Sequence, residues 1–291
     1  MHIFLEFLQT QPNFYLFLVF LIGLAIGSFL NVVIVRLPIM IEKDWREECC
    51  NLLDFDPPNT KQKEQFNLIR PSSHCPFCKN KIKIIENIPL LSYLYLRGKC
   101  SSCKKKISLR YPIVELISAL SVCIVADFFG VSLQAFFAIC LTWAIIVLSA
   151  IDLDTRYLPD DITLPLLWLG IIINFFGIFT DINSSILGAI FGYGILWIVY
   201  FLFKLITGKI GMGHGDFKLL AVFGAWFGWQ NLTPIIILSS IAAILVATLL
   251  IINKSYDKNK GIPFGPYLAF AGWISMLLGP YMISVYLNAT I

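Results

Sequence analysis

Charged residues are scarce in this sequence. Asp, Glu, Lys and Arg make up 14% of its 291 residues, whereas hydrophobic residues make up 58%. An ordinary soluble domain has about 25% charged residues, so the composition excludes that class. The net charge of +4 is too small to indicate a nucleic-acid partner, and none is expected. Long apolar runs fill most of the chain, and they predict an all-α polytopic membrane protein.

The apolar runs match the length of membrane-spanning helices, which need about 20 residues each. The first run covers about residues 14–35, and no Lys or Arg precedes it, in contrast to a cleaved secretory signal. We therefore expect residues 1–35 to form an N-terminal tail and an uncleaved transmembrane helix that stops at Arg36-Leu37-Pro38. Further spans, giving about eight in total and a seven-helix core over residues 112–291, are expected at residues 112–130, 132–150, 162–179, 184–205, 217–230, 232–252 and 264–288.

Lysine and arginine are missing from every second loop of this arrangement. The loops near residues 130–132, 179–185 and 230–233 contain neither, whereas the hydrophilic insert at residues 36–111 holds 15 of the 22 basic residues. The remaining basic residues fall in or beside the segments near residues 151–161, 204–217 and 253–263. Because cytoplasmic loops of membrane proteins are enriched in Lys and Arg, the insert is predicted to be cytoplasmic and the N-terminus to lie outside.

The insert contains two cysteine pairs, Cys75-Pro-Phe-Cys78 and Cys100-Ser-Ser-Cys103. Each Cys-x-x-Cys pair can wrap around a metal ion, and together they offer four thiolates, the set that favours tetrahedral Zn²⁺. Two disulfides or a redox dithiol are less favoured, because structural disulfides are rare in the cytosol. An iron centre with four thiolates, or a fold without metal, remains an alternative. We predict a structural zinc site that stabilises a module with a small core.

Two acidic residues lie at the ends of predicted spans. Asp152 follows the third span, and Asp216 follows the fifth within Gly213-His-Gly215-Asp216. Two membrane crossings separate them, so both are expected on the same face of the membrane. Two close carboxyl groups share a proton, so that one can activate a water molecule while the other acts on the substrate carbonyl. Gly213 and Gly215 lack a Cβ and would leave room for an extended substrate beside Asp216.

Each of these acids also has a structural interpretation. Asp152 could form an interfacial ion pair with Arg156, one helical turn further on, and Asp216 could pair with Lys218 or Lys209. Asp160 lies where a helix cap is expected. The occurrence of two acids at one face, each at the end of a span, favours peptide hydrolysis.

Two other classes of function use the same features. A proton-coupled transporter would employ paired acids near the middle of the membrane, in a chain with internal symmetry. The acids here lie at one face, and the sequence has no repeat of fixed period. A membrane scaffold with a zinc module would leave both Asp152 and Asp216 dispensable.

Several motifs together resemble the type IV prepilin peptidases, a leader peptidase and N-methyltransferase family related to the Gly-x-Gly-Asp intramembrane aspartyl proteases. The resemblance covers nearly the whole chain. It is carried by Gly27-Ser-Phe-Leu-Asn-Val-Val33, the four cysteines, Arg110-Tyr-Pro-Ile-Val-Glu115, Ile151-Asp-Leu-Asp154, Leu158-Pro-Asp160, Gly213-His-Gly-Asp-Phe-Lys218 and Pro263-Phe-Gly-Pro266.

The resemblance implies that Asp152 and Asp216 are the catalytic aspartates. It also implies that a bacterial inner-membrane enzyme removes the basic leader of prepilins and pseudopilins, the subunits of type IV pili and type II secretion systems, at the cytoplasmic face. The enzyme would then methylate the new N-terminal residue with S-adenosylmethionine. The insert contains no Gly-x-Gly-x-x-Gly fingerprint, so the sequence does not place the methyl-donor site.

Overall fold

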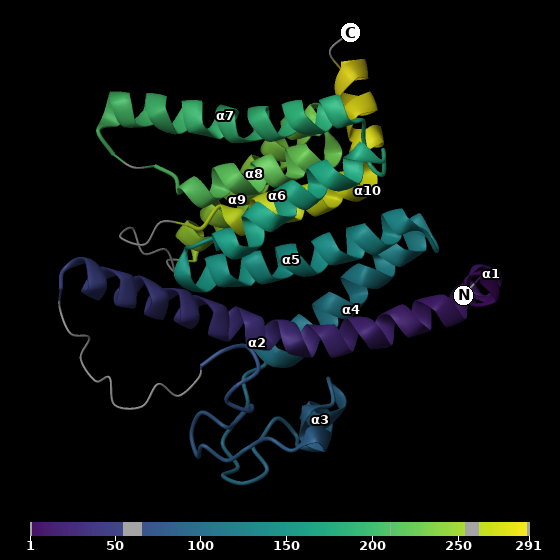
Figure 1. The fold of residues 1–291 in the computed structure, drawn as a ribbon, viewed down its shortest axis with the longest axis vertical. Coiled ribbons are helices and arrows are strands. Elements are labelled where there is room, and N and C mark those ends of the chain that lie inside the picture. The colour runs from purple at the N-terminus through teal and green to yellow at the C-terminus, as the bar shows by residue number, and fades with distance from the viewer. Residues whose placement is uncertain (1, 55–65, 210, 254–261, 290–291) are drawn as a thin grey trace. The chain divides into compact units, whose positions relative to one another are not determined.

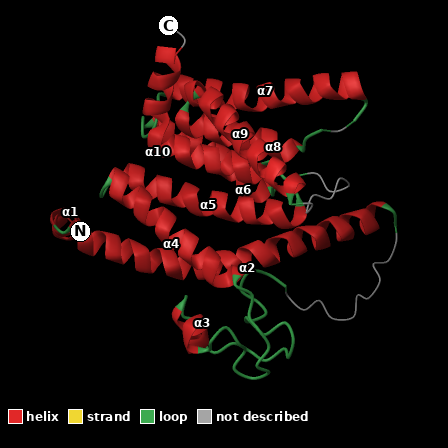
Figure 2. Cartoon of the chain, turned by 180° about the vertical axis from the view of Figure 1, so that it is seen from behind, coloured by secondary structure: helices red, strands yellow, loops and turns green. Residues whose placement is uncertain are grey.

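The computed structural model describes residues 2–54, 66–209, 211–253 and 262–289, and most of these are helical (Figures 1 and 2). Within these ranges the only β-structure consists of two isolated bridges. The predicted all-α class is therefore confirmed. The chain divides into two compact units, Met1–Val131 and Ser132–Ile291.

The first unit is built on a pair of long helices, α2 (Pro12–Leu52) and α4 (Arg110–Phe129), with the short α1 (His2–Thr10) before them. Polar groups join the pair at two levels. The Ser118 hydroxyl donates to the Gly23 carbonyl at 2.7 Å, and the Asn31 amide donates to the Tyr111 carbonyl at 3.1 Å. Side chains that hydrogen-bond to a neighbouring helix hold helices together where apolar solvent does not.

The expected end of the first helix at Arg36-Leu37-Pro38 is wrong, because α2 continues through Pro38 to Leu52. Proline lacks an N–H group, so it removes one hydrogen bond of the helix without necessarily ending it. The segment after it is rich in Glu, Lys and Arg, which are good helix formers. Arg46 and Glu42, one turn apart, also form an ion pair at 2.8 Å.

Between α2 and α4 the chain forms what we call the cysteine module, residues 66–109. It contains a short 3₁₀ helix, η1 (Ile84–Asn87), and one short α-helix, α3 (Leu91–Tyr95). Loops make up most of the remainder. Such a module has little regular structure to hold it, so it needs other cross-links.

The second unit consists of helices around one central helix, α8 (His214–Phe227). Every residue of α8 from Asp216 to Phe227 is buried except Lys218. Helices α6, α7 and α10 pack against it, and α5 and α9 pack against α10. The surrounding helices are α5 (Leu133–Thr155), α6 (Asp160–Phe175), α7 (Ile182–Thr207), α9 (Leu232–Ile252) and α10 (Gly265–Ala289), with the 3₁₀ turn η2 (Trp229–Asn231) before α9.

All eight expected spans coincide with helices, but two of these helices are short. Among the described residues, six helices are long and apolar enough to cross a membrane: α2, α4, α5, α7, α9 and α10. Helix α6 has 16 residues and α8 has 14. A 14-residue helix extends about 21 Å, less than the hydrocarbon thickness of about 30 Å. The enclosure of α8 by other helices explains how so short an apolar segment is accommodated.

Helices α7 and α8 cross at backbone contact. A Cβ added at Gly188 of α7 would collide with the Gly224 backbone of α8, and the reverse is also true. At Gly192, one turn along, an added Cβ would lie 2.7 Å from the Leu220 carbonyl oxygen. Gly188 and Gly192 form the Gly-x₃-Gly spacing that lets helices approach closely in membranes.

Replacing Gly188 with Ala should therefore destabilise the second unit by about 1–3 kcal/mol, because the added methyl group forces α7 and α8 apart. Thermal unfolding in detergent, followed by the loss of helical circular dichroism, measures the effect. Gly194→Ala on the same helix is the matched control, since a Cβ there meets no atom within 4 Å. Equal unfolding temperatures for the two variants would contradict the close crossing.

Candidate functional site

The first predicted catalytic residue, Asp152, lies near the end of α5 and is only 5% exposed. Its Oδ2 atom accepts a hydrogen bond from the backbone N–H of Gly265 at 3.1 Å. Gly265 is the first residue of α10 and belongs to the Pro263–Pro266 motif. This motif therefore approaches the first aspartate directly and is more than a turn before the last helix.

The second predicted residue, Asp216, lies in the first turn of α8 and is 8% exposed. Its backbone N–H donates to the Gly213 carbonyl at 3.3 Å, which starts the helix. The two aspartates are near enough for the Asp152 carboxylate to act electrostatically on Asp216. The structure thus brings both predicted acids into one buried site.

Leu158 fills the space between the segments that carry the two acids. A Cβ at Gly215 would lie 2.8 Å from the Leu158 Cβ, and a Cβ at Gly265 would lie 3.3 Å from the Leu158 Cδ1. Gly215 is therefore required by close packing. Gly213 is different, because an added Cβ there meets no atom within 4 Å and its φ of −82° suits any residue. The open space beside Gly213 borders the start of α8.

The Lys218 partner suggested for Asp216 is not the one observed. Lys218 does not pair with Asp216; its Nζ binds both carboxylate oxygens of Asp160 at 2.7 Å. Asp160 is not a helix cap, because Pro159 holds that position and Asp160 lies in the first turn of α6. This pair links α6 to α8 and leaves Lys218 engaged with Asp160 instead of Asp216.

The four predicted metal ligands form a separate cluster in the first unit. The sulfur atoms of Cys75, Cys78, Cys100 and Cys103 all lie within 4.8 Å of one another, and none forms a disulfide. The Cys75 and Cys103 sulfurs are 3.8 Å apart. Four thiolates around a tetrahedral zinc ion, with Zn–S bonds of about 2.3 Å, have sulfurs about 3.8 Å apart. The donor set and its spacing therefore fit zinc.

The backbone around Cys75 prepares this site for metal. The N–H groups of Cys78 and Phe77 lower the pKa of the Cys75 thiol to about 6. A lowered thiol pKa favours the thiolate, which is the form that binds metal ions.

Each cysteine pair lies in the same kind of turn. The Cys75 N–H donates to the Asn80 carbonyl at 2.9 Å, and the Cys100 N–H donates to the Lys105 carbonyl at 2.9 Å. Lys79 and Lys104, directly after each pair, both have a positive φ. This duplication was missed in the sequence, although both segments read Cys-x-x-Cys-Lys-x-Lys-Ile.

Replacing Cys103 with Ser should reduce bound zinc from one ion per chain to nearly none after dialysis against a weak chelator. A serine hydroxyl is not ionised at neutral pH and replaces one of four thiolate ligands poorly. Elemental analysis of the purified chain provides the measurement. Cys49→Ser, an exposed cysteine outside the cluster, should keep its zinc. Absence of metal from the unmodified chain would contradict the assignment.

Comparison with known proteins covers both units. Residues 21–129 match the bacterial peptidase A24 N-terminal domain, and residues 139–248 match the type IV leader peptidase family. The prepilin leader peptidase/N-methyltransferase of Stutzerimonas stutzeri is 49% identical over 97% of both chains. This chain belongs to the type IV leader peptidase family. A relative of the same name in Aeromonas salmonicida (strain A449) is 47% identical over 99% of both chains. Another, in Pseudomonas aeruginosa, is 48% identical over 98% of this chain and 97% of its own length. No solved structure matches.

Family membership agrees with the resemblance seen in the sequence. In this type IV leader peptidase the N-terminal domain match includes all four cysteines, and the peptidase match includes Asp152 and Asp216. Its membrane-capable helices and its family make it a multi-pass inner-membrane protein. The transporter and scaffold alternatives are not favoured by these findings.

Proposed function

We propose that this chain removes the leader peptide from type IV prepilins and pseudopilins and then methylates the new N-terminal residue. The observation that carries the proposal is the buried pair Asp152 and Asp216, in a chain whose relatives are named prepilin leader peptidase/N-methyltransferase. An aspartyl pair can hydrolyse a peptide bond with water as the nucleophile.

The two aspartates have different roles in this proposal. A backbone N–H donor favours a charged acceptor oxygen, so the hydrogen bond from Gly265 makes Asp152 the ionised partner. Asp152 then takes a proton from water, and the resulting hydroxide attacks the scissile carbonyl. Asp216 keeps the shared proton and donates it toward the carbonyl oxygen. When the tetrahedral adduct collapses, the C–N bond breaks, the proton held by Asp152 passes to the leaving amine, and a hydroxyl group of the adduct returns a proton to Asp216.

The distribution of basic residues supports an orientation for the chain. The insert at residues 36–111 is cytoplasmic, the N-terminus lies outside, and residues 112–291 form the peptidase core in the bilayer. Both aspartates are then at the cytoplasmic ends of their helices. A prepilin has a basic leader followed by an apolar helix, so its scissile bond arrives at that same depth.

The zinc ion has a structural role in this proposal. Cys75, Cys78, Cys100 and Cys103 would hold it and fix the fold of the cysteine module. S-adenosylmethionine supplies the methyl group that is transferred to the new amino terminus. The chain's own contribution to that step is to bind the donor and to position the amine.

A purified reaction tests the proposed function directly. The chain in detergent is incubated with a prepilin-like substrate, with and without S-adenosylmethionine, and the products are weighed by mass spectrometry. We expect loss of the leader in both reactions and a gain of one methyl group only with the donor. A substrate that stays intact under both conditions would argue for another function.

A further inference from the structure

The ion pair between Lys218 and Asp160 joins the starts of two helices of the second unit. The Lys218 Nζ atom lies 2.7 Å from each carboxylate oxygen of Asp160, across 58 positions of the chain. The side chains of Lys218 and Asp160 are 27% and 44% exposed. Ion pairs with this much exposure contribute little to stability, because water screens their charges. The contribution of this pair therefore lies in the elements that it holds together.

The helix that carries Asp216 begins without a side-chain cap. Its N-cap residue is Gly213, whereas a Ser or Asp at that position would supply an acceptor for the free N–H groups. Gly215 lies within the first turn, and glycine is a poor helix former. Helix ends of this kind fray unless contacts outside the helix fix them. Asp216 lies in this first turn, so its position depends on such contacts.

Asp160 is a well-anchored partner for the start of α8. It lies in the first turn of α6, where the helix dipole favours a negative side chain. The ring of Pro159 restricts the backbone before it, and the Pro159 carbonyl accepts the Thr163 hydroxyl at 3.2 Å. Leu158 is buried, and a Cβ at Gly215 would lie 2.8 Å from its own Cβ. The segment that ends in Asp160 is therefore held by packing as well as by α6.

We propose that Lys218 is a positioning residue for peptide hydrolysis. Its ion pair with Asp160 holds the starts of α6 and α8 together and keeps Asp216 aligned with Asp152. Asp160 follows Asp152 by eight residues, so the pair ties the segment after the first acid to the helix that carries the second. Direct action of Lys218 on the substrate is less favoured, because both oxygens of Asp160 already engage its ammonium group. The inference rests on the proposed peptidase function, since it concerns the geometry of that reaction.

Lys218→Met tests the inference by removing the charge while keeping the length of the side chain. We expect kcat for leader removal to fall about tenfold, because a small displacement of a catalytic group slows the chemical step. KM should stay within about twofold, since an interaction that acts only in the transition state leaves substrate affinity unchanged. Asp160→Asn should have the same effect from the other side of the pair. Cleavage rates of the full-length chain in detergent, at several concentrations of a prepilin-like substrate, give both constants.

A double-mutant cycle shows whether the two residues act through one contact. Lys218→Met combined with Asp160→Asn should lower kcat no further than either single change, because the second change removes no additional interaction. Lys218→Arg retains the pairing, since a guanidinium group also binds a carboxylate through two N–H groups, and should keep kcat within about threefold. Lys209→Met and Asp161→Asn change exposed residues of the same unit and are the matched controls. Both should leave kcat and KM unchanged.

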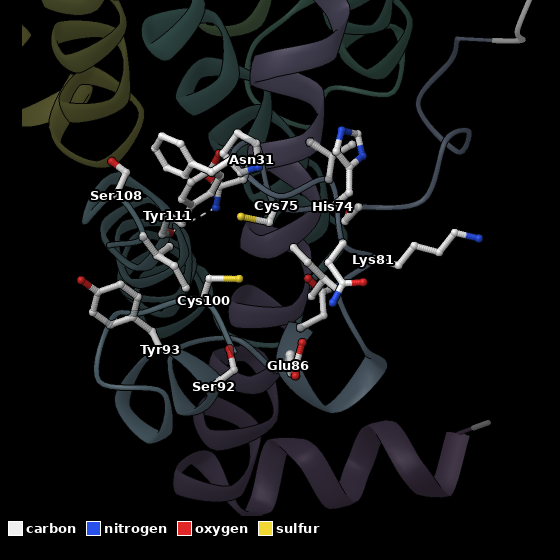
Figure 3. Close-up of a pocket in the computed structure, with 18 of the residues that line it drawn as sticks. Asn31, His74, Cys75, Lys81, Glu86, Ser92, Tyr93, Cys100, Ser108 and Tyr111 are labelled. Carbon is white, nitrogen blue, oxygen red and sulfur yellow. Dashed lines mark hydrogen bonds between the residues drawn. The ribbon is translucent and has the colours of Figure 1, made fainter. Parts of the chain in front are cut away.

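The first unit supplies an independent check that each variant is folded. Figure 3 shows Cys75 and Cys100 on the wall of a cavity of about 710 Å³, whose lining residues all lie between Ser28 and Glu115. Substitutions at positions 160 and 218 therefore change neither this cavity nor the cysteine cluster. Bound zinc should equal that of the unmodified chain in every variant, and the unfolding temperature reports on the second unit.

Four results would count against these assignments in different ways. Unchanged kcat in folded Lys218→Met and Asp160→Asn would overturn the inference while leaving the proposed function intact. A raised KM with unchanged kcat would overturn it as well, because Lys218 would then serve substrate binding. A double variant much slower than either single variant would show that the two side chains act independently. An unmodified chain that cleaves no prepilin would contradict the proposed function and the inference together.

Discussion

Asp152→Asn and Asp216→Asn should each lower the rate of leader removal by at least about 10³-fold. An amide cannot exchange a proton as a carboxyl group does, and general acid–base catalysis contributes about 10²–10⁴-fold. Both side chains are buried, and the charge of Asp152 acts on Asp216, so each substitution removes one member of an interacting pair. The rate is measured as the appearance of the shortened pilin by mass spectrometry with the purified variants.

Asp161→Asn is a suitable control for these variants. Asp161 is exposed in the first turn of α6, and its isosteric replacement removes a carboxylate from the same unit. Its rate should stay within about twofold of the unmodified chain, as expected for a surface substitution. Methylation of a pilin supplied without its leader should persist in all three variants, which separates a chemical defect from misfolding. A folded Asp152 or Asp216 variant that cleaves at the normal rate would exclude the aspartyl pair.

Gly265→Ala should reduce leader removal about 100-fold. The added Cβ would lie 2.6 Å from the Asp152 Oδ2, closer than van der Waals contact allows. The carboxylate must then move or lose its hydrogen bond to the Gly265 N–H, and a displacement of about 1 Å in a catalytic group can cost about 10²-fold. Rates of cleavage at saturating substrate give the measurement.

Gly194→Ala serves as the control, since it adds the same methyl group in open space. Gly265→Ala should still bind zinc and should still methylate a pilin without its leader, because the cysteine cluster belongs to the other unit. If its cleavage rate matched that of Gly194→Ala, the Gly265 hydrogen bond would have no part in positioning Asp152.

The local features of this protein were predictable from the sequence. Apolar runs located α2 and the helices from α4 to α10, because a helix buried in protein or facing lipid contains few charged residues. The two Cys-x-x-Cys pairs predicted their cluster, since the turn that places two sulfurs on one ion is encoded within a few residues. The end of α2 was missed because hydropathy falls at Arg36, while the helix-forming residues beyond Pro38 continue the helix.

Contacts between distant segments were less accessible. The sequence indicated that Asp152 and Asp216 share a face, but it could not show that Gly265 binds the first of them across 113 positions. Hydropathy also cannot distinguish a helix surrounded by lipid from one surrounded by protein. Helix α8 is surrounded by protein, because α6, α7 and α10 pack against it. Only these neighbours explain why a helix of 14 residues can be so apolar.

Two helices begin at the aspartyl pair, α8 beside Asp216 and α10 at Gly265. The N-terminus of a helix carries about half a positive charge from its aligned peptide dipoles. These dipoles are fixed in place, so they stabilise negative charge without reorganising as it develops. Their field would stabilise the negative charge that Asp152 carries in the proposed mechanism, and it would also attract the charge of a phosphinate that mimics the tetrahedral adduct.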